Sequence, residues 1–207
     1  MPSTEPVAAE RAAAERPILF SAPMVRAILE DRKAQTRRVM KPQPPVGTRS
    51  VYRPFGGELN NWQGARGDLI AWYGRCPYGQ EGDRLWVRET LRPSQSQVVT
   101  YAEDGCPAWR HGESVTWPWP KTPLVRTAIF MPRWASRILL GVVEVRAQRL
   151  HDIQESDALA EGVEVKVREN GALVPFRELW DSINEKRGFG WRGNPWVWAI
   201  TFKRLQV

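Results

Sequence analysis

The sequence predicts an α+β protein, a small mixed β-barrel or sheet with flanking helices and two loop-rich insertions. Three runs with strand composition carry this prediction, at 84–88, 138–150 and 196–202. The helical patterns between them are sparse and do not alternate with strands as in a doubly wound parallel fold. A length of 207 residues suits one domain with elaborations, which we place at 17–207.

The N-terminal part predicts a tail, a short strand and a helix. Residues 1–16 are rich in Ala, Glu and Arg without a continuous apolar stretch, which is typical of a flexible tail. An apolar run at 18–20 is compatible with a strand. Ser21 as N-cap and Pro23 in the first turn then predict an amphipathic helix over 22–32. The apolar residues on its inner face are Val25, Ile28 and Leu29.

Two segments rich in Pro and Gly predict insertions at about 41–75 and 92–132. In the first, only 69–73 has strand composition. The second is interrupted by a strand-like run at 98–102. Its sequence Trp-Pro-Trp-Pro at 117–120 cannot lie in a central strand, because proline has no backbone N–H to donate. We expect both segments to be surface elaborations.

The clearest strand is 84–88, which follows a turn at Gly82 and Asp83. Its residues alternate, so one face carries apolar side chains and the other carries an aromatic and a basic one. These pairs are Leu85 with Val87, and Trp86 with Arg88.

The second half predicts two more strands and two helices. A long strand over 138–150 contains Gly141, which marks a bulge or a close approach. Asp152 and Glu155 resemble a capping box that starts a short helix ending at Gly162. A further helix has a core face of Phe176, Leu179, Trp180 and Ile183. The last strand places Trp196, Trp198, Ile200 and Phe202 on one face.

Composition points to a polyanionic partner. The chain has 30 Lys and Arg against 23 Asp and Glu, a formal net charge of +7, so nucleic acid is the leading partner. Eleven tryptophans supply both core residues and candidate stacking platforms for bases. Only two cysteines are present and no run approaches the ~20 apolar residues of a membrane span, so we expect a cytoplasmic protein.

A basic cluster lies where the first helix should end. It comprises Arg32, Lys33, Arg37 and Arg38, and it encloses Thr36. Cations at this end of a helix interact favourably with the helix dipole, which is one interpretation. The other is a nucleic-acid grip or one half of a catalytic site.

The order of these elements resembles the ASCH family of the PUA-like superfamily, in particular its long branch found in phages and prophages. In that family a helix ends in Gly-x-Lys-x-x-Thr-x-Arg and lines a cleft. Segment 31–38 matches this pattern, except that Asp31 replaces the glycine. The Gly82–Asp83 turn and the aromatic strand at 196–202 are also similar. The resemblance implies a PUA-like small mixed β-barrel.

The resemblance implies two functions for one cleft. Most PUA-like domains are regarded as binders of RNA or modified nucleobases. Some small ASCH members are amidohydrolases that remove acyl groups from N4-acylated cytidine through a Thr, a Lys and a Glu. The matching positions here are Lys33, Thr36 and Glu161. The candidate residues for binding nucleic acid or substrate are Arg32, Arg37, Arg38, Trp86 and Arg88.

The implied chemistry is reasonable for these side chains. A threonine hydroxyl attacks an amide carbonyl only if a base removes its proton, and Lys33 is that base if neighbouring arginines lower its pKa. A continued helical path would bring Lys33 and Thr36 to one side. Glu161, just before Gly162, opposes the helix dipole, so local helix stability does not explain it. Asp31 beside Lys33 would raise the lysine pKa.

Three hypotheses follow from the sequence. The first is a module that binds RNA, single-stranded nucleic acid or a modified nucleobase in a basic cleft. The second is the amidohydrolase. The third is a phage accessory module whose Trp-rich insertions bind another protein. We expect no cofactor and no metal, because four potential ligands lack the regular spacing of zinc sites. They are Cys76, Cys106, His111 and His151.

Overall fold

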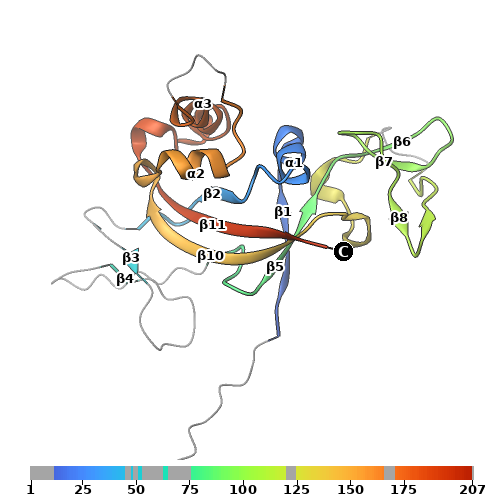
Figure 1. Ribbon diagram of the computed structural model, residues 1–207, viewed down its shortest axis with the longest axis horizontal. Coiled ribbons are helices and arrows are strands. Elements are labelled where there is room, and N and C mark those ends of the chain that lie inside the picture. The colour runs from blue at the N-terminus through green and yellow to red at the C-terminus, as the bar shows by residue number, and fades with distance from the viewer. Residues whose placement is uncertain are drawn as a thin grey trace, which may run out of the picture.

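The computed structural model describes residues 12–44, 48, 51–52, 63–64, 76–119, 125–165 and 171–206. The α+β class is confirmed. A five-stranded sheet of order β1-β5-β10-β11-β2 forms its centre (Figure 1), with β1 parallel to β5 and the other pairs antiparallel. The strands are β1 (Glu15–Leu19), β2 (Gln35–Val39), β5 (Arg84–Arg88), β10 (Leu139–Arg149) and β11 (Trp196–Leu205). Within the described ranges the sheet is open, with β1 and β2 as its edge strands.

The first strand is longer than the apolar run 18–20 indicated. β1 begins at Glu15, inside the segment that we expected to be a tail, and its backbone pairs with β5. The buried Asp83 carboxylate fixes this pairing, since it accepts hydrogen bonds from Ala14 N (3.0 Å), Arg16 Nη1 (2.7 Å) and Gln80 N (3.1 Å). The turn before β5 is therefore an anchor for the N-terminal strand.

Helix α1 (Ala22–Leu29) ends earlier than predicted. The chain reverses at Asp31, which has a φ of 56°, in the left-handed region that Asp tolerates better than most residues. β2 then starts at Gln35, so the path through Thr36 is extended. The expectation that a helical path brings Lys33 and Thr36 to one side was therefore wrong, because strand pairing with β11 overrides the local helical pattern.

The two long strands, β10 and β11, have the features predicted from the sequence: an apolar face on β11 and a close approach at Gly141 of β10. On β11, Trp196, Trp198, Ile200 and Phe202 belong to one apolar core together with α1 and the inner residues of β5, Leu85 and Val87. Gly141 is a point of close approach, since a Cβ there would lie 3.3 Å from a Leu205 side-chain carbon. The irregularity of β10 lies between Val142 and Glu144 instead.

The other helices pack on the opposite side of β11. They are α2 (Glu155–Ala160) and α3 (Leu173–Asn184), followed by the 3-10 turns η4 (Glu185–Arg187) and η5 (Trp191–Gly193). A second core joins Phe176 and Trp180 of α3 to Ala158 of α2 and Val197 of β11. In Figure 1, α2 and α3 lie at one end of the sheet.

The start of α2 differs from the prediction. Asp157 Oδ2 accepts a hydrogen bond from Gln154 N (3.4 Å) and so occupies the carboxylate position of the capping box. Asp152 instead accepts from Arg149 N (3.0 Å) in the preceding turn η3 (Leu150–Asp152). Asp152, which the sequence pattern assigned to the start of the helix, belongs to this 3-10 turn instead. As predicted, Gly162 ends the helix, with a φ of +80°.

The second insertion forms a small lobe at the other end of the sheet (Figure 1). Its elements are β6 (Leu91–Pro93), β7 (Val99–Tyr101), β8 (Trp109–Arg110), β9 (Glu113–Ser114), η1 (Ala128–Phe130) and η2 (Arg133–Ala135). The lobe has its own apolar core around Leu91, Val99 and Met131, so it is more ordered than a surface loop.

In the first insertion, β3 (Val51–Tyr52) and β4 (Gln63–Gly64) pair, and the strand predicted at 69–73 lies outside the described residues. No helix in the described ranges is long and apolar enough to cross a membrane.

Candidate functional site

A cavity of about 720 Å³ opens along the free edge of β2. β2 forms one wall through residues 36–39, and α3 with η4 forms the opposite wall. The segment 19–24 and the turn η1 of the lobe close the remaining sides. The site therefore depends on segments that are far apart in the sequence.

The cavity combines aromatic and basic side chains. Its aromatic residues are Phe20, Tyr78, Phe176, Trp180 and Phe189, and its cations other than Arg37 are Arg38, Lys41 and Arg187. Two cations lie over rings: Arg38 Cζ is 5.1 Å from the Phe20 centroid, and Lys41 Nζ is 5.4 Å from that of Phe189. Such a lining suits a flat aromatic ligand that carries negative charge.

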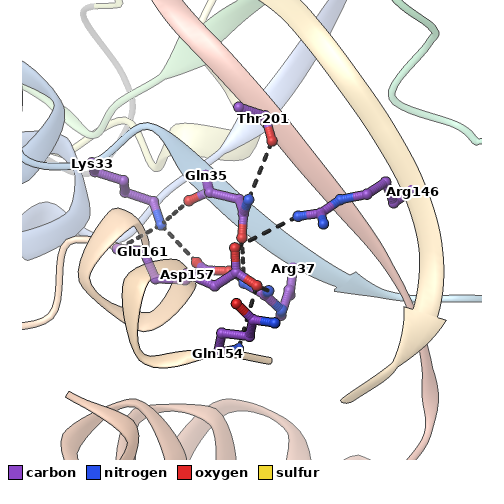
Figure 2. A network of polar contacts seen from close by, with 8 residues as sticks. All are labelled: Lys33, Gln35, Arg37, Arg146, Gln154, Asp157, Glu161 and Thr201. Carbon is purple, nitrogen blue, oxygen red and sulfur yellow. Dashed lines mark hydrogen bonds and ion pairs between the residues drawn. The ribbon is translucent and has the colours of Figure 1, made fainter. Parts of the chain in front are cut away.

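A buried polar network adjoins this cavity through Arg37 and Glu161. Its contacts are drawn in Figure 2. Lys33 Nζ donates hydrogen bonds to Glu161 Oε2 (2.9 Å), the Glu161 carbonyl (2.7 Å) and the Gln35 carbonyl (2.8 Å). These three hydrogen bonds use all three N–H donors of the ammonium group. The Lys33 side chain has an exposed fraction of 0% and that of Glu161 is 4%, so the ion pair is removed from solvent.

Arg37 binds the other side of the same carboxylate. Its Nη1 donates to Glu161 Oε1 (3.1 Å) and Gln35 Oε1 (2.6 Å), and its Nη2 to Asp157 Oδ2 (2.7 Å). Arg146 Nη2 approaches Asp157 Oδ1 at 3.6 Å (Figure 2). Each Glu161 oxygen thus faces a buried cation, which explains why a carboxylate is tolerated at the C-terminal end of α2.

Gly162 allows this contact between distant segments. A Cβ at this position would lie 2.8 Å from Lys33 Cβ and 2.9 Å from Ala27 Cβ. Ala34 N also donates to the Ala160 carbonyl at 2.8 Å. The end of α2 therefore packs directly against the connection between α1 and β2, and this packing places Glu161 beside Lys33.

Complete burial lowers the pKa of Lys33, and the adjacent Glu161 carboxylate acts in the opposite direction. The charges of Arg38 and Arg37 add smaller lowering contributions, as expected from the sequence. Asp31 does not act as predicted, since its carboxylate lies 3.0 Å from Arg204 Nη2 and makes no contribution to the Lys33 shift. The reversal at Asp31 directs this side chain to the surface.

Thr36 is buried and lines the cavity together with Glu161. In the described structure no hydrogen bond joins its hydroxyl to Lys33 or to Glu161. The structure thus brings Lys33 and Glu161 into contact and places Thr36 on the same cavity, without a nucleophile-to-base hydrogen bond.

The remaining predicted binding residues occupy different places. Arg38 lines the cavity, and Arg37 lines it while belonging to the buried network. Arg32 forms an exposed ion pair with Glu30 and does not line the cavity. Trp86 lies beneath Arg88, whose Cζ is 4.7 Å from the ring, on the far face of β5. Neither belongs to the cavity lining.

Sequence reasoning missed several residues of this cavity, including Lys41, Tyr78 and Arg187. It assigned one face of α3 to core packing, which is confirmed for Phe176 and Trp180 and wrong for Ile183, which is exposed. The same face also lines the cavity. The basic pair Lys186 and Arg187 after α3 was the available signal for a ligand-facing end.

Among the described residues no group of three His, Cys, Asp or Glu side chains is arranged to hold a metal ion. Both cysteines are free, Cys76 buried and Cys106 exposed.

No protein-family model matches the sequence, and no curated protein matches it significantly. One solved structure is similar at a low level: the crystal structure of protein EF3133 from Enterococcus faecalis V583, described with the family model DUF984. The alignment has 8% sequence identity, covers 95% of this chain and 82% of that chain, and has a TM-score of 0.41.

Proposed function

We propose that this chain is an ASCH-type, PUA-like module that binds RNA, single-stranded nucleic acid or a modified nucleobase in the cavity at the edge of β2. The observation that supports this proposal is the cavity lining, where Arg38, Lys41 and Arg187 stand among five aromatic residues. Aromatic faces stack on any base, and arginine and lysine bind phosphates. The formal net charge of +7 attracts the same ligand at longer range.

The polar residues of the cavity supply hydrogen-bonding groups for a base edge. A carboxylate has about four lone-pair sites, so Glu161 retains acceptor capacity for an exocyclic amino group after binding Lys33 and Arg37. The Thr36 hydroxyl both donates and accepts. Cytosine, adenine and guanine carry such amino groups, whereas uracil and thymine do not, which favours the first three bases.

Fluorescence anisotropy with labelled single-stranded RNA and DNA tests this function. We expect binding that weakens with salt. At a given salt concentration Arg187→Ala should bind more weakly than the wild type. It should also reduce the slope of log affinity against log salt concentration by about one for each phosphate that the variant no longer neutralises. Arg177→Ala is the matched control, since Arg177 is exposed on α3 and does not line the cavity. Salt-independent binding, or none to either polymer, would refute the proposal.

The second candidate is the amidohydrolase. It is favoured by Thr36 and Glu161 sharing one cavity, and by the contact of Lys33 with that carboxylate. In this reaction the Thr36 hydroxyl attacks the acyl carbon and gives its proton to a neutral Lys33, which passes the proton to the amine nitrogen as the C–N bond breaks. Water then hydrolyses the resulting Thr36 ester, which releases the carboxylic acid and restores the hydroxyl. Lys33 must first release one of its three bonded protons, which the lowered pKa assists.

Release of cytidine from N4-acetylcytidine measures this activity. Thr36→Ala should abolish turnover while leaving the buried ion pairs intact. Lys33→Ala and Glu161→Gln should abolish it too, with circular dichroism to separate loss of chemistry from loss of fold. Undiminished turnover in a folded Thr36→Ala protein would exclude this mechanism.

A further inference from the structure

Arg38 is a cation of the cavity without a carboxylate partner. Its Nη2 donates to the Leu19 carbonyl, and its Nε is inaccessible to solvent and has no hydrogen-bond partner. Its Cζ lies 5.1 Å from the Phe20 ring centroid and 5.7 Å from that of Tyr78. No carboxylate oxygen of the described residues lies within ion-pair distance of this guanidinium.

The neighbouring Arg37 differs in having carboxylate partners, although its Nε, like that of Arg38, is buried without a hydrogen-bond partner. It bonds to Asp157 and Glu161 on the side of α2, whereas Arg38 lies over the rings of Phe20 and Tyr78 and lines the cavity. The two residues alternate on β2, so they project to opposite faces. Asp157 and Glu161 therefore form ion pairs with Arg37 and none with Arg38, on which Glu161 acts only at longer range.

Two further cations line the same cavity. Lys41 and Arg187 form no ion pair in the part of the chain described. Burial lowers the pKa of Arg38, Tyr78 and Glu161 act in the opposite direction, and the charge of Arg187 adds a smaller lowering contribution. Glu161 is already matched by Lys33 and Arg37. Among the described residues, the cavity consequently holds three cations without a carboxylate partner, and their charges repel one another.

Phosphate is the anion that fits this arrangement. A partly desolvated guanidinium with free N–H donors binds phosphate oxygens through parallel, charge-assisted hydrogen bonds. The lysine and the second arginine can share the remaining charge. Thr36 lies two residues from Arg38 on the same face, about 7 Å away at the usual strand rise, so a base and its phosphate can contact both.

We propose that Arg38, with Arg187 and Lys41, forms a phosphate subsite, so that the ligand of the cavity is a phosphorylated nucleoside and not a free nucleoside. This inference rests on the proposed nucleobase-binding function. The phosphate belongs either to a nucleoside monophosphate or to the phosphodiester backbone of a single strand. Both present the same anionic oxygens.

Isothermal titration calorimetry tests the subsite. The ligands are the ribonucleosides, their 5′-monophosphates and single-stranded oligonucleotides of about ten nucleotides. We expect the monophosphates to bind at least about tenfold more tightly than the matching nucleosides, and Arg38→Ala to remove this difference. Arg187→Ala should reduce it in part, and Arg177→Ala should preserve it.

The outcomes separate the two proposals. Equal affinities for nucleosides and monophosphates in the wild type would overturn the phosphate subsite and leave nucleobase binding standing. Absence of binding for all three ligand classes would overturn both. If Arg38→Ala fails to fold, Arg38→Lys and the exposed Arg187→Ala decide, and an unchanged preference for monophosphates in both overturns the subsite. If the monophosphates bind more tightly than the nucleosides, the subsite is supported: still tighter binding of the oligonucleotide then identifies a phosphodiester backbone as the source of the phosphate, and weaker binding identifies a nucleoside monophosphate.

Discussion

Replacing Glu161 with glutamine tests whether the buried network holds the cavity together. Glu161 has an exposed fraction of 4%, and its two oxygens face Lys33 and Arg37, whose side chains are both at 0%. A glutamine offers one acceptor oxygen, so its amide N–H group must point at one of these two cations. The substitution therefore removes one charge-assisted hydrogen bond and leaves a buried positive charge uncompensated.

The expected loss in the free energy of unfolding is about 3–4 kcal/mol, near the lower end of the range for breaking a buried ion pair. Urea unfolding followed by tryptophan fluorescence measures it. With a slope of about 2–3 kcal/mol per molar urea, the midpoint should fall by about 1–2 M. Glu178→Gln on the exposed face of α3 is the control and should change stability by no more than about 0.5 kcal/mol. A loss below about 1 kcal/mol for Glu161→Gln would refute this account.

Lys33→Met completes a double-mutant cycle with Glu161→Gln. Because each single variant leaves an unpaired buried group, the double variant should cost less than the sum, with a coupling of about 1–3 kcal/mol. The pH dependence gives a second check. Burial holds the pKa of Lys33 in the folded protein below its ordinary value of 10.5, which applies to the unfolded chain. At a pH between the folded and the unfolded pKa, the unfolded chain therefore binds more protons than the folded protein. Stability contributed by Lys33 should rise with pH in that interval, and Lys33→Met should lack this rise. Additive variants would show that the pair is not coupled.

Two further predictions concern packing and reactivity. Gly162→Ala should destabilise the protein by about 2–5 kcal/mol, from the left-handed φ and the collision with Lys33 Cβ, whereas Gly188→Ala, at the same φ of +80° but in open space, should cost only about 1–2 kcal/mol. Equal losses in thermal unfolding would contradict the close approach at Gly162. A thiol reagent should label the exposed Cys106 quickly and label Cys76 only when the protein unfolds. Burial shields the Cys76 thiol from the reagent and raises its pKa to about 12, so that little reactive thiolate forms. Rapid labelling of both thiols in the native state would contradict this burial.

Local patterns predicted elements where burial follows sequence alternation. Leu85 and Val87 are buried on one face of β5, and the tryptophans of β11 share another, because a strand presents alternate residues to one side whatever its partner is. The helix stop at Gly162 was equally predictable, since it depends on the conformational range of a single residue. The left-handed turn at Asp31 was not predicted, because 22–32 has a continuous helical pattern.

The candidate site was only partly predictable. The sequence placed Glu161 at a helix end where it opposes the dipole, and this indicated that a partner lies elsewhere. It could not show that Arg37 shares this partner and Arg38 does not, since both stand in one basic run. Nor did it predict Arg187 in the cavity, because that requires knowing which helix lies across from β2.

The sequence by itself determined the α+β class, the faces of the principal strands and the residues that form the basic run at 32–38. Only the tertiary structure decided what each member of that run does: Arg32 lies on the surface, Lys33 and Arg37 neutralise Glu161, and Arg38 faces the cavity unpaired. The physical reason is the range of the forces involved. Alternation and turn geometry act within a few residues, whereas the pairing of a charge depends on which distant segment the fold brings beside it, here 128 residues along the chain.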